Sequence, residues 1–560
     1  MQIKYNRNSH DDDCFIFEGF KSYVRFSAQP DSPAAASAKV YSGPTISSSA
    51  SPESFTNINI LLSGCIEHHA ECRNTLGGTP VDDHSQPPTL PTYILDVGHS
   101  NPPSPSIRLV EAEPGQRGHY AALSYCWGPS PAHHPPTTTS ANLASHTAGI
   151  PLSTLPKTFQ DAVTATRELG LRHLWIDTLC TVQPTTTSSQ AAPHRASTAR
   201  TARTAYSLAQ IVLAAASAAT PTAGLFRQYP PRTFATVPYL DGAGHAAGTM
   251  RAELRPSPRA LSPEHGALND CAWATAPLVL ARRVAYFTAG AVVWSCRRLR
   301  RTARWDDGVL DYFAAARPTD WARVVTAHST RALAVPGERL EALEGVVEEL
   351  ALARRRKSGG GGEVQCVFGV WTDALATQLM WGRIGAPGSL SRPSALAEVA
   401  PSWSWASTEG GVSMMEEGQW RGDGGGDGLE VRAQLALDDG TGDKRRIRAK
   451  GKLGRVELRV IEKLDPYLHP CDCEVRSLDG DDDFVGLAAS DVGLGEGVMT
   501  AVVWCLVVLF HPYNCPGGSY LALFLRPREH GSDHYERIGH GMVVKKEWAD
   551  RLVESELYMV

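Results

Sequence analysis

The sequence lacks an apolar run long enough to cross a bilayer. The longest such run, Val498–Phe510, falls short of the roughly 20 helical residues that a membrane span needs. The first fifteen residues, MQIKYNRNSHDDDCF, contain three consecutive acids and no apolar core of signal-peptide length, which argues against secretion. We therefore expect a soluble cytoplasmic protein with no membrane span.

An excess of positive charge is also absent. The chain has 560 residues, of which 54 are Lys or Arg and 59 are Asp or Glu, for a net charge of −5. This balance gives no electrostatic basis for binding nucleic acid or an anionic membrane surface. The basic clusters at 297–301 and 354–357 are short and typical of solvated surface. We expect no nucleic-acid partner.

Signatures of a nucleotide-driven sensor are missing as well. The glycine run at 358–363 lacks the Gly-Lys-Ser/Thr ending of a phosphate-binding loop. No segment recurs at a fixed period, so the sequence shows no array of structural repeats.

The twelve cysteines are scattered along a chain without a secretion signal, which indicates reduced thiols rather than a disulfide framework. A compact thiol–imidazole cluster that could supply zinc ligands consists of Cys65, His68, His69 and Cys72. No second pair of Cys or His residues at zinc-finger spacing lies nearby. Cys471 and Cys473 are separated by a single residue and lie far along the chain. We therefore expect no metal site.

The segment from residue 120 to 226 alternates apolar strands with helices. A strand is expected at the start of Tyr120–Gly128 and a buried strand over Leu171–Cys180. Between them, apolar positions at three- and four-residue spacing predict a helix that starts near Pro156 and ends before Gly170. A strand follows at the start of Ile211–Phe226. Crossovers of this length imply right-handed βαβ units and an α/β fold.

These blocks resemble the fungal heterokaryon-incompatibility (HET) domain. LSYCWG, LPKTFQDAV with RELGLRHLWIDTLC, and IVLAAASAA ending in GLF occur in the order expected for that family. Weaker similarity extends over about residues 60 to 560. The resemblance implies a parallel sheet with flanking helices similar to the Toll/interleukin-1 receptor fold. It also implies a role in non-self recognition and programmed cell death, through self-association or an incompatibility partner.

Two stretches depart from the family pattern. From Pro184 to Thr220 there is no Asp or Glu, although relatives have acids after the second strand; only Tyr206 and the apolar strand that follows fit. Further on, Ala276 and Pro277 stand where Gln and Glu are expected, and a proline there would interrupt a helix at a cost of roughly 3 kcal/mol. These losses leave open the alternative of a degenerate, inactive family member.

The sequence divides into three parts. Residues 1–59 are rich in Ser, Pro and Ala and are expected to be disordered. The resemblance implies that residues 60–300 form a HET domain with its core at 120–226. Residues 301–560 form a mixed α+β, mostly β region that contains glycine-rich loops near 358–363 and 422–428. Its tryptophan-dense piece, Trp371–Trp405, is expected to pack that region.

Asp177 is the candidate catalytic residue. A carboxylate at the carboxyl end of a parallel strand lies where open α/β sheets bind ligands, and burial there would raise its pKa. The alternative is a structural carboxylate that caps a helix or binds loop amides. Residues expected to line the same crevice are Ser124, Tyr125 and Cys180. The other acids of the core, Asp161 and Glu168, are expected to be solvated charges on one side of a helix.

Some proteins of the Toll/interleukin-1 receptor fold cleave the N-glycosidic bond of NAD, and this reaction needs a carboxylate beside the ribose. The resemblance therefore gives an alternative function, a NAD-cleaving hydrolase, in which NAD is a substrate. No resident cofactor is firmly implied.

Overall fold

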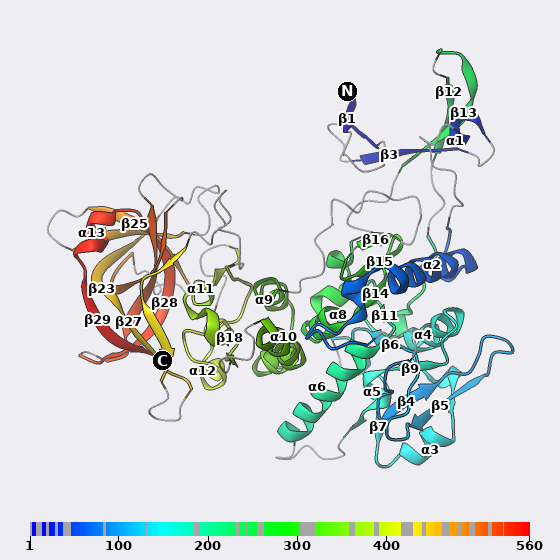
Figure 1. The fold of residues 1–560 in the computed structure, drawn as a ribbon, viewed down its shortest axis with the longest axis horizontal. Helices are drawn as coiled ribbons and strands as arrows, with labels where there is room; N and C mark the ends of the chain where they lie inside the picture. Colours follow the sequence, from blue (N-terminus) through cyan, green and yellow to red (C-terminus); the bar gives the residue numbers. More distant parts are fainter. Residues whose placement is uncertain are drawn as a thin grey trace. The chain divides into compact units, whose positions relative to one another are not determined.

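In the computed structural model of the chain, the described residues divide into two compact units (Figure 1). The first comprises Met1–Arg317 with Glu344–Glu349, and the second comprises Pro318–Leu343 with Leu350–Val560. The structure describes residues 3–6, 14–17, 22–28, 32–36, 46–81, 86–129, 133–183, 191–229, 234–241, 243–254, 262–298, 300–302, 320–357, 364–385, 391–415, 429–438, 444–461, 471–478, 483–491, 499–512, 518–529 and 531–560.

The first unit is built on a nine-stranded sheet with the order β16-β15-β14-β11-β6-β9-β4-β5-β8. Its strands are β4 (Tyr93–Asp96), β5 (Ser106–Glu111), β6 (Tyr120–Ser124), β8 (Ile150–Pro151), β9 (His173–Trp175), β11 (Ile211–Ala214), β14 (Arg283–Phe287), β15 (Val292–Cys296) and β16 (Arg300–Thr302). The four central strands, β14, β11, β6 and β9, are parallel to one another, and antiparallel strands extend the sheet on both sides. Every residue of β6, β11 and β14 is buried, as expected for strands covered on both faces.

Helices α4 (Lys157–Glu168) and α6 (Ala191–Leu208) make the crossovers of this parallel core. α4 joins β6 to β9, and α6 joins β9 to β11, which pairs with the other side of β6. The chain moves one way along the sheet from β6 to β9 and the other way from β9 to β11. Because both crossovers are right-handed, the two helices lie on opposite faces of the sheet. The predicted helix before Gly170 is confirmed, and Gly170 adopts a φ of 71°, the left-handed conformation that ends helices.

The strand predicted over Leu171–Cys180 is wrong beyond Trp175. The chain leaves the sheet after β9 and forms the single-turn helix α5 (Asp177–Cys180). The Asp177 carboxylate accepts the Thr178 N–H at 2.7 Å, so this side chain satisfies a backbone donor at the start of the turn. The apolar pattern alone could not separate a short strand from a strand followed by one buried helical turn.

The helix break expected at Pro277 does not occur. Pro277 is the third residue of α8 (Thr275–Leu280), and the N–H groups of a first helical turn have no partner within the helix. A proline in that turn removes no helical hydrogen bond. The other departing stretch also keeps its scaffold, because α6 forms within it; residues 184–190 lie outside the described part.

The segment expected to be disordered, residues 1–59, contains strands β1 (Ile3–Asn6), β2 (Cys14–Phe17) and β3 (Ser22–Ser27). They share a five-stranded sheet with β12 (Phe234–Leu240) and β13 (Ala246–Leu254). Helix α2 (Pro52–His68) also begins inside this segment, with the Ser51 side chain accepting the Ser54 N–H. The prediction used the average composition of residues 1–59, which hid the short apolar and aromatic runs that form these strands. Part of the Ser/Pro/Ala-rich stretch lies outside the described residues.

The β-rich C-terminal region is confirmed. Its main strands are β23 (Ile447–Val460), β24 (Cys473–Ser477), β25 (Phe484–Ser490), β26 (Thr500–His511), β27 (Ser519–Pro527), β28 (His534–Val543) and β29 (Val553–Met559). The pairings run β26-β27-β28-β25-β24-β23 and then return from β23 to β26, which closes the sheet on itself. Alternate residues of β23 and β24 point to the buried interior. The glycine-rich loops near 358–363 and 422–428 lie outside the described residues.

Beside this closed sheet, four tryptophans of the tryptophan-dense piece have no exposed surface, as expected: Trp371, Trp381, Trp403 and Trp405. The indole N–H groups of Trp321 and Trp405 both donate to the Gly369 carbonyl at 2.9 Å. This shared acceptor satisfies two buried donors with one backbone oxygen.

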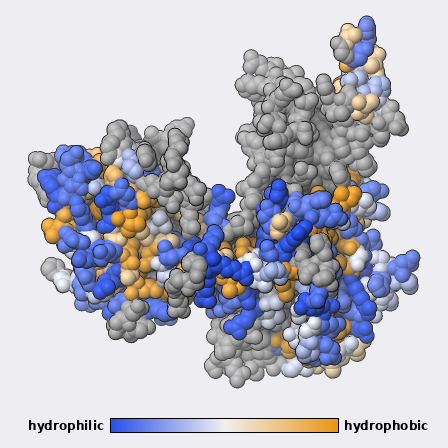
Figure 2. Space-filling model, in the orientation of Figure 1, coloured by the Kyte–Doolittle hydropathy of each residue, from blue (hydrophilic) through white to orange (hydrophobic). Residues whose placement is uncertain are grey.

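Hydrophilic residues cover most of the visible surface of the described residues, with apolar patches among them (Figure 2). Within the described part of the chain, no helix has the length and apolarity that a bilayer crossing requires.

Candidate functional site

The carboxyl ends of β6 and β9 bring Tyr125 and Asp177 together. These strands are adjacent and parallel, so the residues that follow them meet at one edge of the sheet. The Tyr125 hydroxyl donates to Asp177 Oδ1 at 2.9 Å and lies 3.1 Å from Thr178 Oγ1. The same Asp177 oxygen accepts the Thr178 N–H. The sequence therefore identified two residues that the fold joins directly.

Burial changes the electrostatics of this pair. Desolvation raises the pKa of Asp177, although hydrogen bonds from Tyr125, the Thr178 amide and Trp127 oppose that shift. Burial also raises the pKa of Tyr125 well above its ordinary value, and the nearby Asp177 charge adds to the effect. Tyr125 therefore remains a hydrogen-bond donor at neutral pH, and Asp177 is a positioned carboxylate that protonates more readily than an exposed one.

The loop after β6 exposes an aromatic surface beside this carboxylate. Trp127 is 41% exposed, and its ring meets His134 edge to face with 5.7 Å between centroids. Gly128 has a φ of 94°, and a Cβ there would lie 2.8 Å from His133 Cβ, so the turn requires glycine. Asp177 itself is partly exposed. A carboxylate and a partly exposed indole thus lie close together at this edge.

Ser124 and Cys180 are both 2% exposed. Ser124 ends β6, and its carbonyl accepts the Ala215 N–H at 2.9 Å. The Cys180 thiol lies 3.4 Å from the Ile176 nitrogen, and burial raises its pKa to about 12. A thiol with that pKa stays protonated at neutral pH. The described geometry therefore gives Ser124 and Cys180 packing roles next to the Tyr125–Asp177 pair.

Residues 120–249 match the family model described as Heterokaryon incompatibility protein (HET). The chain carries a HET domain. The match starts at the first residue of β6 and ends within β13, so it includes α4, β9, α5, α6 and β11. Tyr125 and Asp177 both belong to the HET domain. Neither the curated proteins nor the solved structures gave a match.

Asp161 is a structural residue of the HET domain, and the expectation that it is a solvated charge is wrong. The residue is 3% exposed, and its side chain accepts the backbone N–H groups of Leu225 at 2.9 Å and Phe226 at 3.2 Å. It also pairs with Lys157, one turn earlier on α4. Glu168 is exposed, as expected. The seven-residue spacing placed Asp161 and Glu168 on one side of the helix. It could not show that Leu225 and Phe226 later cover Asp161 and leave Glu168 exposed.

Tyr206 packs under the same edge of the HET domain. Its hydroxyl donates to the Leu123 carbonyl at 3.0 Å, and its ring meets Trp175 edge to face at 5.1 Å. The tyrosine that survives in the departing stretch therefore holds α6 against β6 and β9.

A pair of thiols lies at the end of β6. Cys126 Sγ is 2.9 Å from Cys271 Sγ and 3.4 Å from the Ala267 carbonyl. Cys126 is 4% exposed and Cys271 is partly exposed. No sequence signal links these cysteines, which are 145 residues apart.

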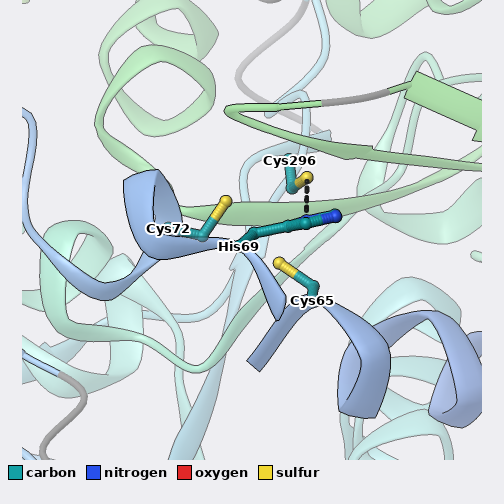
Figure 3. A group of neighbouring side chains, drawn as sticks. All are labelled: Cys65, His69, Cys72 and Cys296. Carbon is teal, nitrogen blue, oxygen red and sulfur yellow. Dashed lines mark hydrogen bonds between the residues drawn. The ribbon is translucent and has the colours of Figure 1, made fainter. Parts of the chain in front are cut away.

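Upstream of the HET match, the thiol–imidazole cluster has a different membership from the one suggested by sequence. Cys65, His69 and Cys72 converge with Cys296, the last residue of β15, and all four ligand atoms lie within 4.8 Å of one another (Figure 3). His68 is exposed instead, with its ring 3.6 Å from Glu67. Sequence spacing could not find Cys296, because a single cysteine in a buried strand has no pattern of its own.

Proposed function

We propose that this chain is a fungal non-self recognition protein, in which activation of the HET domain leads to programmed cell death. The observation that carries the proposal is the match of residues 120–249 to the HET family, which spans the parallel strands β6, β9 and β11 with their crossover helices α4 and α6. The proposal includes action in the cytoplasm, which fluorescence imaging of the tagged full chain would test.

Within this proposal, the HET domain signals by contact with another copy or with an incompatibility partner. The exposed indole of Trp127, on a loop that glycine geometry fixes, is suited to such contact. Large aromatic side chains contribute strongly when an interface buries them. The trigger would come from a partner or from the C-terminal region, since the sequence contains no nucleotide-binding motif or repeat array.

Inducible expression of the full chain in a filamentous fungus tests this function. We expect wild-type expression to reduce viability and Trp127→Ala to restore it. Trp273→Ala is the matched control, because Trp273 is a similarly exposed tryptophan, 46%, outside the matched segment. Equal loss of killing in both variants, at equal protein levels, would contradict a specific role for Trp127. The wild-type chain should also be expressed in several host strains that differ in incompatibility background. Full viability of every strain would contradict the proposed function and favour an inactive relative.

A NAD-cleaving activity is the second candidate, favoured by the positioned Asp177 carboxylate beside an exposed indole. In that reaction water cleaves the bond between nicotinamide and ribose, giving nicotinamide, ADP-ribose and a proton. The carboxylate would stabilise positive charge that develops on the ribose, and the indole would stack on a planar ring. Tyr125 would hold the carboxylate in place through its hydroxyl.

Nicotinamide release from NAD by the purified full chain tests this activity. We expect release that falls at least about 100-fold in Asp177→Asn, in line with the loss of one electrostatic catalytic group. Circular dichroism would verify that the variant is folded. No release by wild type at high protein concentration would reject the enzymatic candidate while leaving the signalling proposal intact.

A further inference from the structure

The end of α2 is shaped to present three ligand side chains in one direction. Cys65 lies in the last turn of α2, and His69 follows four residues later, where its N–H still bonds to the Cys65 carbonyl at 3.1 Å. Residues four apart on a helix lie on the same side. The short helix η1 (Ala70–Arg73) then turns the chain back, with the Cys72 N–H bonded to the His69 carbonyl at 3.0 Å.

The sheet supplies a fourth ligand. Cys296 ends β15, and its Sγ lies 3.4 Å from Nδ1 of His69, as the dashed line in Figure 3 shows. Three of the four residues are buried, with exposed fractions of 1% for Cys65 and 0% for Cys72 and Cys296, while His69 is partly exposed. Side chains from a helix end, a short turn and a strand 227 residues from His69 therefore converge on one point.

The size of the cluster fits a tetrahedral metal ion. Zinc bonds to sulfur and nitrogen at about 2.1–2.3 Å, which places the ligands of a tetrahedron roughly 3.5–3.8 Å apart. The four ligand atoms here lie within 4.8 Å of one another, and the thiol–imidazole pair at 3.4 Å is close to the tetrahedral separation. Three thiols and one imidazole form a ligand set that zinc binds in structural sites.

A neighbouring cation balances the charge that such a site would carry. Zinc with three thiolates and a neutral imidazole has a net charge of about −1. The fully buried Arg283 donates from Nε to Cys65 Sγ at 3.2 Å, and it lies directly opposite Cys296 in the β14–β15 pairing. Its guanidinium also donates to the Cys72 carbonyl at 3.4 Å. Hydrogen bonds of this kind hold metal ligands in orientation and stabilise thiolate charge.

We propose that Cys65, His69, Cys72 and Cys296 bind one zinc ion, which ties the end of α2 to β15. The four protein ligands leave no coordination position for substrate, so the site is structural rather than catalytic. Its purpose is to join the segment that precedes the HET match to the sheet on which the HET domain is built. The proposal is independent of the biological role inferred above.

Metal analysis of the purified full chain tests the site. We expect about one zinc ion per chain by inductively coupled plasma mass spectrometry after purification without chelator. Cobalt exchanged into the protein should give an intense near-ultraviolet thiolate-to-metal band and tetrahedral visible bands, and this signature does not depend on activity. Cys296→Ala and His69→Ala should each reduce bound zinc at least about tenfold, because loss of one ligand weakens a closed site.

Cys505→Ala is the matched control, because Cys505 has the same 0% exposure as Cys296 but lies in the closed C-terminal sheet. This variant should keep its zinc. The growth medium should contain added zinc. Wild-type protein that then carries less than a tenth of an equivalent of bound zinc would overturn the proposal, even if no variant could be purified. A disulfide between two of the four residues in protein kept under reducing conditions, or full zinc retention by Cys296→Ala, would also overturn it.

Discussion

Asp161 Oδ2 accepts the Leu225 N–H at 2.9 Å and so fixes the turn after β11 to the middle of α4. The Phe226 N–H reaches the same oxygen at 3.2 Å. A side chain of one crossover helix thus sets the path of the chain as it leaves the parallel core.

Replacing Asp161 by alanine should destabilise the first unit. Two backbone donors would lose their acceptor, and an unsatisfied buried donor costs about 1–3 kcal/mol. We expect the free energy of unfolding to fall by about 2–3 kcal/mol in urea titrations. Glu168→Ala, on the exposed part of the same helix, should change it by less than about 0.5 kcal/mol. Similar losses in both variants would show that the turn does not depend on Asp161.

The Asp96 carboxylate should stabilise the first unit at neutral pH. It accepts two hydrogen bonds from Arg172, at 3.0 and 2.9 Å, and further ones from Arg108, and these bonds lower its pKa. Because the folded pKa is below the unfolded value of about 3.9, this stabilisation is present above that pH and is lost as the pH falls toward the folded pKa. Both guanidinium groups are about half exposed, which limits the effect.

We therefore expect Asp96→Asn to lower the free energy of unfolding by about 1–2 kcal/mol at pH 7. The difference from wild type should shrink below about pH 4. Denaturation curves at several pH values would measure it, with the exposed Asp270 replaced by asparagine as the control. A difference that stays constant with pH would contradict the role of the ionised carboxylate.

Asp177 should have the opposite pH dependence. Its folded pKa is raised by burial, so the folded protein retains a proton that the unfolded chain has already lost. Stability from this group is full below the unfolded pKa of about 3.9 and declines as the pH rises through the folded pKa. Asp177→Asn removes this decline and keeps an oxygen that can accept from Tyr125.

At pH 7 we expect Asp177→Asn to be at least as stable as wild type. Its advantage should grow between pH 4 and neutral pH in thermal unfolding experiments, which is the sign opposite to that of Asp96→Asn. A clear loss of stability at pH 7 would identify Asp177 as a residue that the fold requires in its charged form.

Gly369 should tolerate no side chain. It has a φ of 79°, and a Cβ there would lie 2.5 Å from Nε1 of Trp405, the indole that donates to its own carbonyl. Gly531 has a φ of 80° with nothing within 4 Å of the same position. Backbone strain alone costs about 1–3 kcal/mol for a residue other than glycine.

We expect Gly531→Ala to lower the free energy of unfolding of the second unit by about 1 kcal/mol and Gly369→Ala by at least about 3 kcal/mol. Tryptophan fluorescence would follow both transitions. Equal effects would show that the indole moves aside at little cost.

Local patterns predicted the crossover helix α4 and the parallel strands, because apolar spacing and glycine positions act within a few residues. They also placed Tyr125 and Asp177 at one edge, since the ends of adjacent parallel strands must meet. The boundary between β9 and α5 was missed, because a buried helical turn and a buried strand have the same apolar composition.

Long-range neighbours decided the remaining features. Asp161 looks like a surface acid until residues 225 and 226 return to cover it, and Cys296 looks like an ordinary core thiol until β15 brings it to the end of α2. Neither relationship has a signal in the intervening sequence. Leu225 follows Asp161 by 64 positions, and Cys296 follows His69 by 227. Composition likewise obscured the N-terminal strands.

The contact between the end of α2 and β15 also sets the earliest time at which this part of the fold can be completed during translation. His69 is synthesised 227 residues before Cys296. At about 5–20 residues per second, this interval lasts roughly 10–45 s. Until β15 emerges, Cys65, His69 and Cys72 at the end of α2 lack their neighbour Cys296, so this contact forms only after the whole HET match has been synthesised.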